Sequence, residues 1–158
     1  MPNELISNDP IVAQNFFLEI DGEIVTILSG VSGFDVEVDV VSMQQAGKDG
    51  KVQIVKTRGN DNKPPDLSLT RMAPNDSSQD KLWGWFMDIR DKGLTGDRAS
   101  NRKNGSIVLY NTSNAEVGRF NFINAWPSKI ATDAVSTDSN EPLKETITLV
   151  CERLDRVK

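Results

Sequence analysis

The chain has 158 residues and a net charge of −5, with 37% hydrophobic and 26% charged residues. This length predicts one domain over residues 1–158 that buries a core without metals or disulfides. The absence of histidine excludes Ser-His-Asp and Cys-His catalysis and His-metal sites, and the acidic balance argues against a protein that tracks nucleic-acid phosphates.

Neither a membrane span nor a secretion signal is expected. The sequence has no run of about 18 apolar residues, and the opening segment MPNELISNDPIVAQNF has no basic region followed by an apolar one. We therefore expect synthesis in the cytoplasm without a signal peptide. The single cysteine, Cys151, cannot form an intramolecular disulfide and is expected to be a small core residue.

The chain is predicted to begin with an irregular N-terminal arm over residues 1–15, in which two prolines discourage regular structure. Two strands are expected to follow, over residues 15–20 and 23–28. The Asp21-Gly22 pair between them is typical of a type I′ turn, which predicts a β-hairpin.

A strand over residues 34–43 alternates acidic and apolar side chains. Side chains two apart share a face, so the valines point one way and the carboxylates the other. The carboxylates are those of Asp35, Glu37 and Asp39. Because removing each one from water would cost several kcal/mol, this face must meet water or cations. Two interpretations stay open, the solvated outer face of a half-buried sheet and the wall of a water-filled lumen.

Residues 44–65 are polar and hold one short β-like run, Val52–Lys56. A connection of this length is uncommon in a compact domain and is usually functional or disordered. The segment is either a projecting hairpin that pairs with something or a flexible loop. Five cations lie in it, namely Lys48, Lys51, Lys56, Arg58 and Lys63. Asp49 and Asp61 dilute them, so nucleic-acid binding is disfavoured.

A helix is predicted over residues 77–91, after a polar cluster typical of a helix N-cap. Its apolar stripe is formed by Leu82, Trp85, Phe86 and Ile89. Trp83 and Met87 widen this stripe, so the helix is either deeply packed or also meets a neighbouring subunit. Gly84 costs about 1 kcal/mol in a helix interior, which predicts close packing against a sheet at that point.

The remaining strands are expected over residues 67–72, 106–111, 116–126 and 145–154. In the first of these, Leu67, Leu69 and Arg71 share a face. Eight or so strands with one helix predict a mainly β fold, either a two-sheet β-sandwich or a partly closed barrel.

No catalytic, cofactor or metal site is expected. The carboxylates of residues 34–43 lie on one open strand, whereas glycosidase pairs usually come from different elements inside an aromatic cleft. Residues 60–62 lack the spacing of a calcium loop. The glycines at 30–33 and 47–50 do not match a phosphate-binding fingerprint. A small hydrolase is therefore a distant alternative.

Three segments carry a resemblance to a known family: DKLWGWFMDIRDKG over 80–93, RKNGSIVLYN over 102–111 and GRFNFINAWPSKI over 118–130. Together with the preceding strands FFLEIDG and GFDVEVDV, and in this order, they resemble the tail tube proteins of contractile-tailed phages. The closer likeness is to the inner tube subunits of phage-tail-like contractile injection systems. The likeness spans nearly all of residues 12–155.

This resemblance implies a non-enzymatic structural subunit with a tail-tube/Hcp-like fold and no cofactor. Such subunits form hexameric rings that stack into a hollow tube within a contractile sheath. The implied partners are further copies of the chain, sheath and baseplate or cap proteins, and protein cargo or DNA passing through the lumen. The chain would then be part of an assembled injection particle or virion tail.

Carried onto this chain, the resemblance makes residues 44–65 a projecting inter-ring loop and residues 1–15 a second contact with neighbours. The candidate contacts between rings or subunits are Met43, Gln44, Lys48, Val52, Ile54, Lys56, Arg58, Trp83 and Met87. The candidates for the lumen wall are Asp35, Glu37 and Asp39. They would give a hydrated negative surface that disfavours sticking by acidic cargo or DNA.

Two other functions stay open. A β-sandwich module that binds ligands or glycans would need an exposed aromatic platform, and only Trp126 is a plausible one because Trp83 and Trp85 belong to the helix. A tube-initiator or baseplate protein would share the fold but occur once per particle. A stable monomer would favour the binding module, whereas rings would favour the tube.

Overall fold

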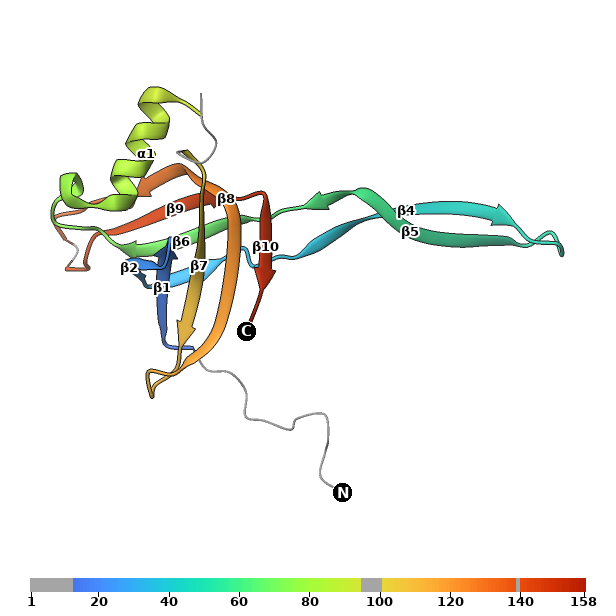
Figure 1. The fold of residues 1–158 in the computed structure, drawn as a ribbon, viewed down its shortest axis with the longest axis horizontal. Helices are drawn as coiled ribbons and strands as arrows, with labels where there is room; N and C mark the ends of the chain where they lie inside the picture. The colour runs from blue at the N-terminus through green and yellow to red at the C-terminus, as the bar shows by residue number, and fades with distance from the viewer. Residues whose placement is uncertain (1–12, 95–100, 139) are drawn as a thin grey trace, which may run out of the picture.

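The computed structural model describes residues 13–94, 101–138 and 140–158, so most of the predicted N-terminal arm over 1–15 lies outside the described residues. The described chain forms a β-rich body with one α-helix and a long two-stranded arm that projects from the body (Figure 1). The predicted mainly β fold with a single helix is confirmed for this part of the chain.

An antiparallel sheet of eight strands builds the body. Its strand order is β2-β1-β7-β8-β9-β6-β3, and β10 pairs with β8 beside this path. The strands are β1 (Asn15–Ile20), β2 (Glu23–Leu28), β3 (Gly30–Ser32), β6 (Asp66–Met72), β7 (Lys103–Tyr110), β8 (Glu116–Thr132), β9 (Lys144–Val150) and β10 (Arg153–Arg156).

The long strand β8 belongs to two layers. Its first part, up to Ala125, pairs with β7 and β10, and its second part, from Trp126, pairs with β9. Asn124 has a positive φ of 52° where the first part ends. The sheet therefore folds into two packed layers, as predicted. The barrel stays open because the strand path ends at β2 and β3.

The core lies between the two layers. Its buried side chains include Leu18, Leu28, Phe122 and Leu154 from the first layer and Leu67, Leu69, Ile147 and Leu149 from the second. Cys151 is buried beside them, and its thiol donates a hydrogen bond to the carbonyl oxygen of Pro65 at 3.3 Å. Burial raises the pKa of the Cys151 thiol. The prediction that Cys151 is a core residue is confirmed.

The helix α1 (Lys81–Lys92) packs on this core through Leu82, Trp85 and Ile89. Gly84, by contrast, faces away from the body, and a Cβ atom built there would meet no atom within 4 Å. The prediction that Gly84 allows close packing against a sheet is therefore wrong, because this glycine lies on the solvent side of the helix.

The helix begins later than the predicted residue 77. A 3₁₀ turn, η1 (Ser77–Gln79), comes first, and Asp80 then has an extended backbone. The carboxylate of Asp80 accepts a hydrogen bond from the backbone N–H of Trp83 at 2.9 Å. This N-cap bond satisfies a donor that the first helical turn leaves unpaired, so α1 starts at Lys81.

The strand boundaries that differ most from prediction are those of β8 and of the C-terminal strand. β8 runs to Thr132 rather than ending at residue 126, because beyond the bend it gains β9 as a partner. The strand predicted over 145–154 is two strands, β9 and β10. The N–H of Glu152 bonds to the carbonyl of Ile123, and the chain turns there to run along the first part of β8.

Candidate functional site: assembly surfaces

The arm consists of β4 (Glu37–Ala46) and β5 (Val52–Lys63), which pair with each other in a sheet of their own. Figure 1 shows this hairpin extending away from the body. At its tip, the N–H of Gly47 donates to the carbonyl of Lys51 at 2.8 Å. Residues 44–65 were expected to be either a projecting hairpin or a flexible loop, and in the structure they belong to a projecting hairpin. The acidic strand is its outgoing strand.

Apolar side chains are exposed on both faces of the arm. Val52 and Ile54 are 64% and 66% exposed on one face. Met43 and Val55 lie opposite each other and are exposed on the other face. A two-stranded hairpin alone is marginally stable in water, and exposed apolar patches mark interaction surfaces. The arm therefore has the composition of a segment that another molecule covers.

The arm also separates charge along the chain. Its distal part, residues 40–58, contains four cations, Lys48, Lys51, Lys56 and Arg58, and one anion, Asp49. This part therefore carries +3, which leaves −8 for the rest of the chain because the total is −5. A basic, apolar projection thus extends from an acidic body.

The three lumen candidates lie at the base of the arm: Asp35, Glu37 and Asp39. The strand begins only at Glu37, and a register shift between Val38 and Val40 interrupts the regular alternation. Both valines are exposed, because none of the described segments packs over them. The interpretation as the outer face of a half-buried sheet is therefore wrong. Asp39 instead lies 3.8 Å from the ammonium group of Lys63.

The two helix candidates, Trp83 and Met87, are both half-buried. The indole Nε1–H of Trp83 donates to both carboxylate oxygens of Glu145 at 3.2 Å. Its ring also meets that of Phe86 edge to face, with the centroids 6.1 Å apart. The indole of Trp83 is thus already hydrogen-bonded within its own chain. The side chain of Met87 is half-buried.

A buried ionic cluster clamps the start of α1 to the sheet. Arg71 of β6 is 2% exposed, and its guanidinium donates to both carboxylate oxygens of Asp80 at 3.0 and 2.7 Å. It also donates to Glu145 at 3.2 Å and to the hydroxyl of Thr26 at 3.3 Å. The cluster joins β2, β6, β9 and the N-cap of the helix.

Hydrogen bonding decides the charge state of Asp80. Burial alone would raise the pKa of this carboxyl, but the bonds from Arg71 and from the N–H of Trp83 outweigh burial and hold the pKa below its usual range. Sequence reasoning missed this cluster. The available signal was the place of Arg71 on the same strand face as Leu67 and Leu69, where an unpaired charge would be costly.

An apolar groove of about 580 Å³ lies between β2 and the end of β6. Ile24 and Ile27 on β2 are 54% and 65% exposed, and Met72 across the groove is 56% exposed. Pro74 continues the wall beyond Met72. Sequence reasoning did not single out this surface, because no local pattern shows that β2 ends the strand path.

The described residues hold no group of three or more His, Cys, Asp or Glu side chains that could bind a metal ion. Among the same residues, no helix has the length and apolar character needed to cross a membrane.

The family profile described as T4-like virus tail tube protein gp19 matches residues 12–155. The chain belongs to this tail tube family. The predicted resemblance is confirmed, and the protein is a structural subunit of a tube.

Several solved structures share the fold of this tail tube protein. The tube-terminating cap of the anti-feeding prophage is 21% identical, with a TM-score of 0.73 over 98% of this chain and 95% of that chain. The sheath/tube terminator of the extracellular contractile injection system PVC is 20% identical, with a TM-score of 0.74 over 97% and 100%. Hcp1 from Flavobacterium johnsoniae is 18% identical, with a TM-score of 0.52 over 90% and 94%. No curated protein sequence matched this chain.

Proposed function

We propose that this tail tube protein forms hexameric rings that stack through the arm into the inner tube of a contractile injection system or contractile phage tail. The observation that carries the proposal is the arm, which leaves the body as a separate hairpin with apolar side chains exposed on both faces. A hairpin of this kind is stable when a neighbour covers it. Stacking of identical rings supplies such a neighbour at every level of a tube.

Ring closure uses the open edges of the body. One end of the strand path is β3, and β10 pairs only with β8 among the described strands, so each of them has an open edge. Unpaired strand edges invite pairing with another chain, and a head-to-tail contact that closes on itself generates a ring. The role is structural, without a catalytic step.

Asp35, Glu37 and Asp39 are the proposed acidic stretch of the lumen wall. In support, Asp35 and Glu37 are exposed, and Asp39 has a cation within 4 Å in Lys63. Repeated around a ring, these carboxylates would repel acidic cargo and keep the channel hydrated. The cargo is protein or DNA, and the outer partners are a sheath and baseplate or cap proteins, in keeping with the cap and the sheath/tube terminator that share the fold.

The test is electron microscopy and light scattering of the full chain beside a variant with a shortened arm. In the variant, an Asn-Gly turn replaces residues 42–56, which joins Val41 to its cross-strand partner Thr57. The full chain is expected to form tubes with a central hole, and the variant is expected to form unstacked rings. A full chain that stays monomeric at every concentration would overturn the proposal. A variant that still stacks would show that stacking does not depend on the arm.

A ring that ends or starts a tube is the second candidate. The observation that favours it is the fold shared with a tube-terminating cap and a sheath/tube terminator. Such a protein would give single rings that do not extend. The same micrographs separate the two roles, because a tube subunit extends with increasing concentration.

A further inference from the structure

We propose that the apolar groove between β2 and the end of β6 receives the distal arm, residues 40–58, of a second copy of this chain. This inference rests on the proposed stacking and adds the receiving surface. Stacking then runs head to tail, with the arm of each copy seated on the body of the next.

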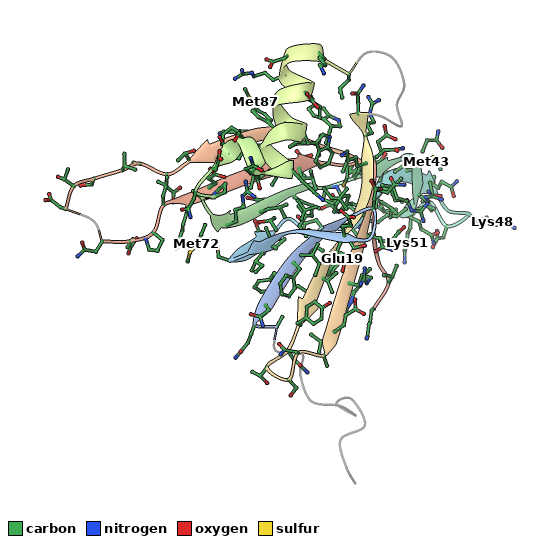
Figure 2. All side chains as sticks on the ribbon, turned by 60° about the vertical axis from the view of Figure 1, so that its left-hand side comes forward. Glu19, Met43, Lys48, Lys51, Met72 and Met87 are labelled. Carbon is green, nitrogen blue, oxygen red and sulfur yellow. The ribbon has the colours of Figure 1, made fainter. Side chains whose placement is uncertain are left out.

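The arm and the groove lie at opposite ends of the molecule. Figure 1 shows the arm extending from one side of the body, with β2 and the end of β6 on the other side. Figure 2, turned by 60°, keeps this separation, with Met43, Lys48 and Lys51 toward one end and Met72 toward the other. Two different surfaces at opposite ends of a molecule can join one copy to the next without closing into a ring. A head-to-tail contact of this type builds a filament.

The two surfaces match in apolar character. Ile24, Ile27 and Met72 are each more than half exposed in the groove, and no described segment of the same chain covers them. Met43 and Ile54 give the arm an apolar side chain on each face. One face of the arm can therefore fill the groove while the other remains for a further neighbour.

The two surfaces also match in charge. The distal arm carries +3. Beside the groove end, the loop between β8 and β9 carries three carboxylates, Asp133, Asp138 and Glu141, and its sequence from 133 to 143 contains no Lys or Arg. Opposite charges at the two ends steer the arm toward the groove and disfavour an arm meeting another arm.

A cross-linking experiment with two single-site variants tests the contact. Met43→Cys places a thiol on the arm and Met72→Cys places one in the groove, at two exposed methionines. The native Cys151 is buried, and burial raises the pKa of its thiol, so we expect it to react much more slowly with a bis-maleimide than the exposed introduced thiols. The full-length variants are assembled alone or mixed in equal amounts, and the cross-linked dimer is then quantified.

The matched control is Ser113→Cys, at an exposed turn between β7 and β8 that does not line the groove. We expect the mixture of Met43→Cys with Met72→Cys to give several-fold more cross-linked dimer than either variant alone or than Met43→Cys with Ser113→Cys. A dominant product from Met43→Cys alone would show arms pairing with each other and would overturn the inference. Equal yields with Ser113→Cys, or no product from samples that contain tubes, would overturn it as well.

Micrographs of the unmodified chain separate this inference from the proposed function. Tubes without the cross-link between arm and groove mean that stacking is right and the receiving surface is wrong. Absence of tubes and rings means that the proposed function itself fails.

A charge exchange gives an independent readout in intact tubes. Lys48→Glu with Lys51→Glu, or Asp133→Lys with Asp138→Lys, is expected to reduce tube formation several-fold. The four changes combined are expected to restore much of it, because opposite charges again face each other. A combined variant no better than either pair would overturn the pairing of the arm with this loop.

Discussion

Arg71 ties the start of the helix to the sheet through a buried ion pair. It reaches the N-cap carboxylate of Asp80 and the carboxylate of Glu145 from a site with almost no contact with water. Removing one partner of a buried ion pair leaves the other charge unpaired and costs about 3–5 kcal/mol. The same cluster should therefore set the response of the fold to acid.

The first prediction concerns acid unfolding and Asp80. Its pKa is held below the unfolded value of about 3.9, so its contribution to stability is present above about pH 4 and is lost as pH falls through the lower folded-state value. The urea midpoint of the unmodified chain should therefore fall as the solution is acidified below about pH 4. In Asp80→Asn this dependence should be weaker.

Asp91→Asn, at an exposed site on the same helix, is the matched control and should keep the acid dependence of the unmodified chain. Parallel curves for Asp80→Asn and the unmodified chain would contradict the role assigned to the cluster.

The second prediction compares two glycines. Gly84→Ala adds a methyl group on the open side of α1 and should raise the free energy of unfolding by up to about 1 kcal/mol, since alanine favours the helix. Gly33→Ala should lower it by more than that, because Gly33 has a φ of 91° and a Cβ there would collide with the backbone carbonyl of Asp66. Urea unfolding of both variants measures the two changes in the free energy of unfolding, which should have opposite signs. Equal changes would contradict the different environments described for these two glycines.

At the scale of elements, the arm forms a sheet separate from that of the body. Its strands pair with each other and not with the strands of the body. The third prediction is that the shortened-arm variant unfolds with a free energy within about 0.5 kcal/mol of the full chain, as for surface changes. Urea unfolding under non-assembling conditions measures this difference. A much larger loss would show that the arm supports the body.

Sequence patterns predicted the elements of the body well because burial imposes their periodicity. Leu82, Trp85 and Ile89 of α1 follow the core-facing spacing, and they do face the core. The same reasoning failed for β4, whose alternation suggested one buried face although valines such as Val38 are exposed. Local alternation indicates a strand but not what covers it, and no described segment of the chain covers the arm.

Long-range pairing explains the other differences. β8 continues to Thr132 because β9 supplies partners from a distant part of the sequence. The groove likewise could not be predicted from local sequence, since it exists only where β2 meets the end of β6. No short stretch of sequence holds that information.

At the scale of the whole molecule, charge is distributed unevenly between the arm and the body. The distal arm carries +3 and the remainder −8. The fourth prediction is that raising NaCl from about 0.05 M to about 1 M, which shortens the Debye length to roughly 3 Å, raises the protein concentration needed for stacking. Light scattering across this salt series measures that concentration. Stacking that strengthens with salt would instead indicate a contact dominated by apolar burial.

Cryo-electron microscopy of the assembled full chain with helical reconstruction would locate every arm in the assembly. We expect hexameric rings stacked around an open channel, with each arm crossing to the next ring and lying on its β2 and Met72 surface. A chain that remains monomeric at every concentration, or tubes in which the arms stay within their own ring, would contradict it.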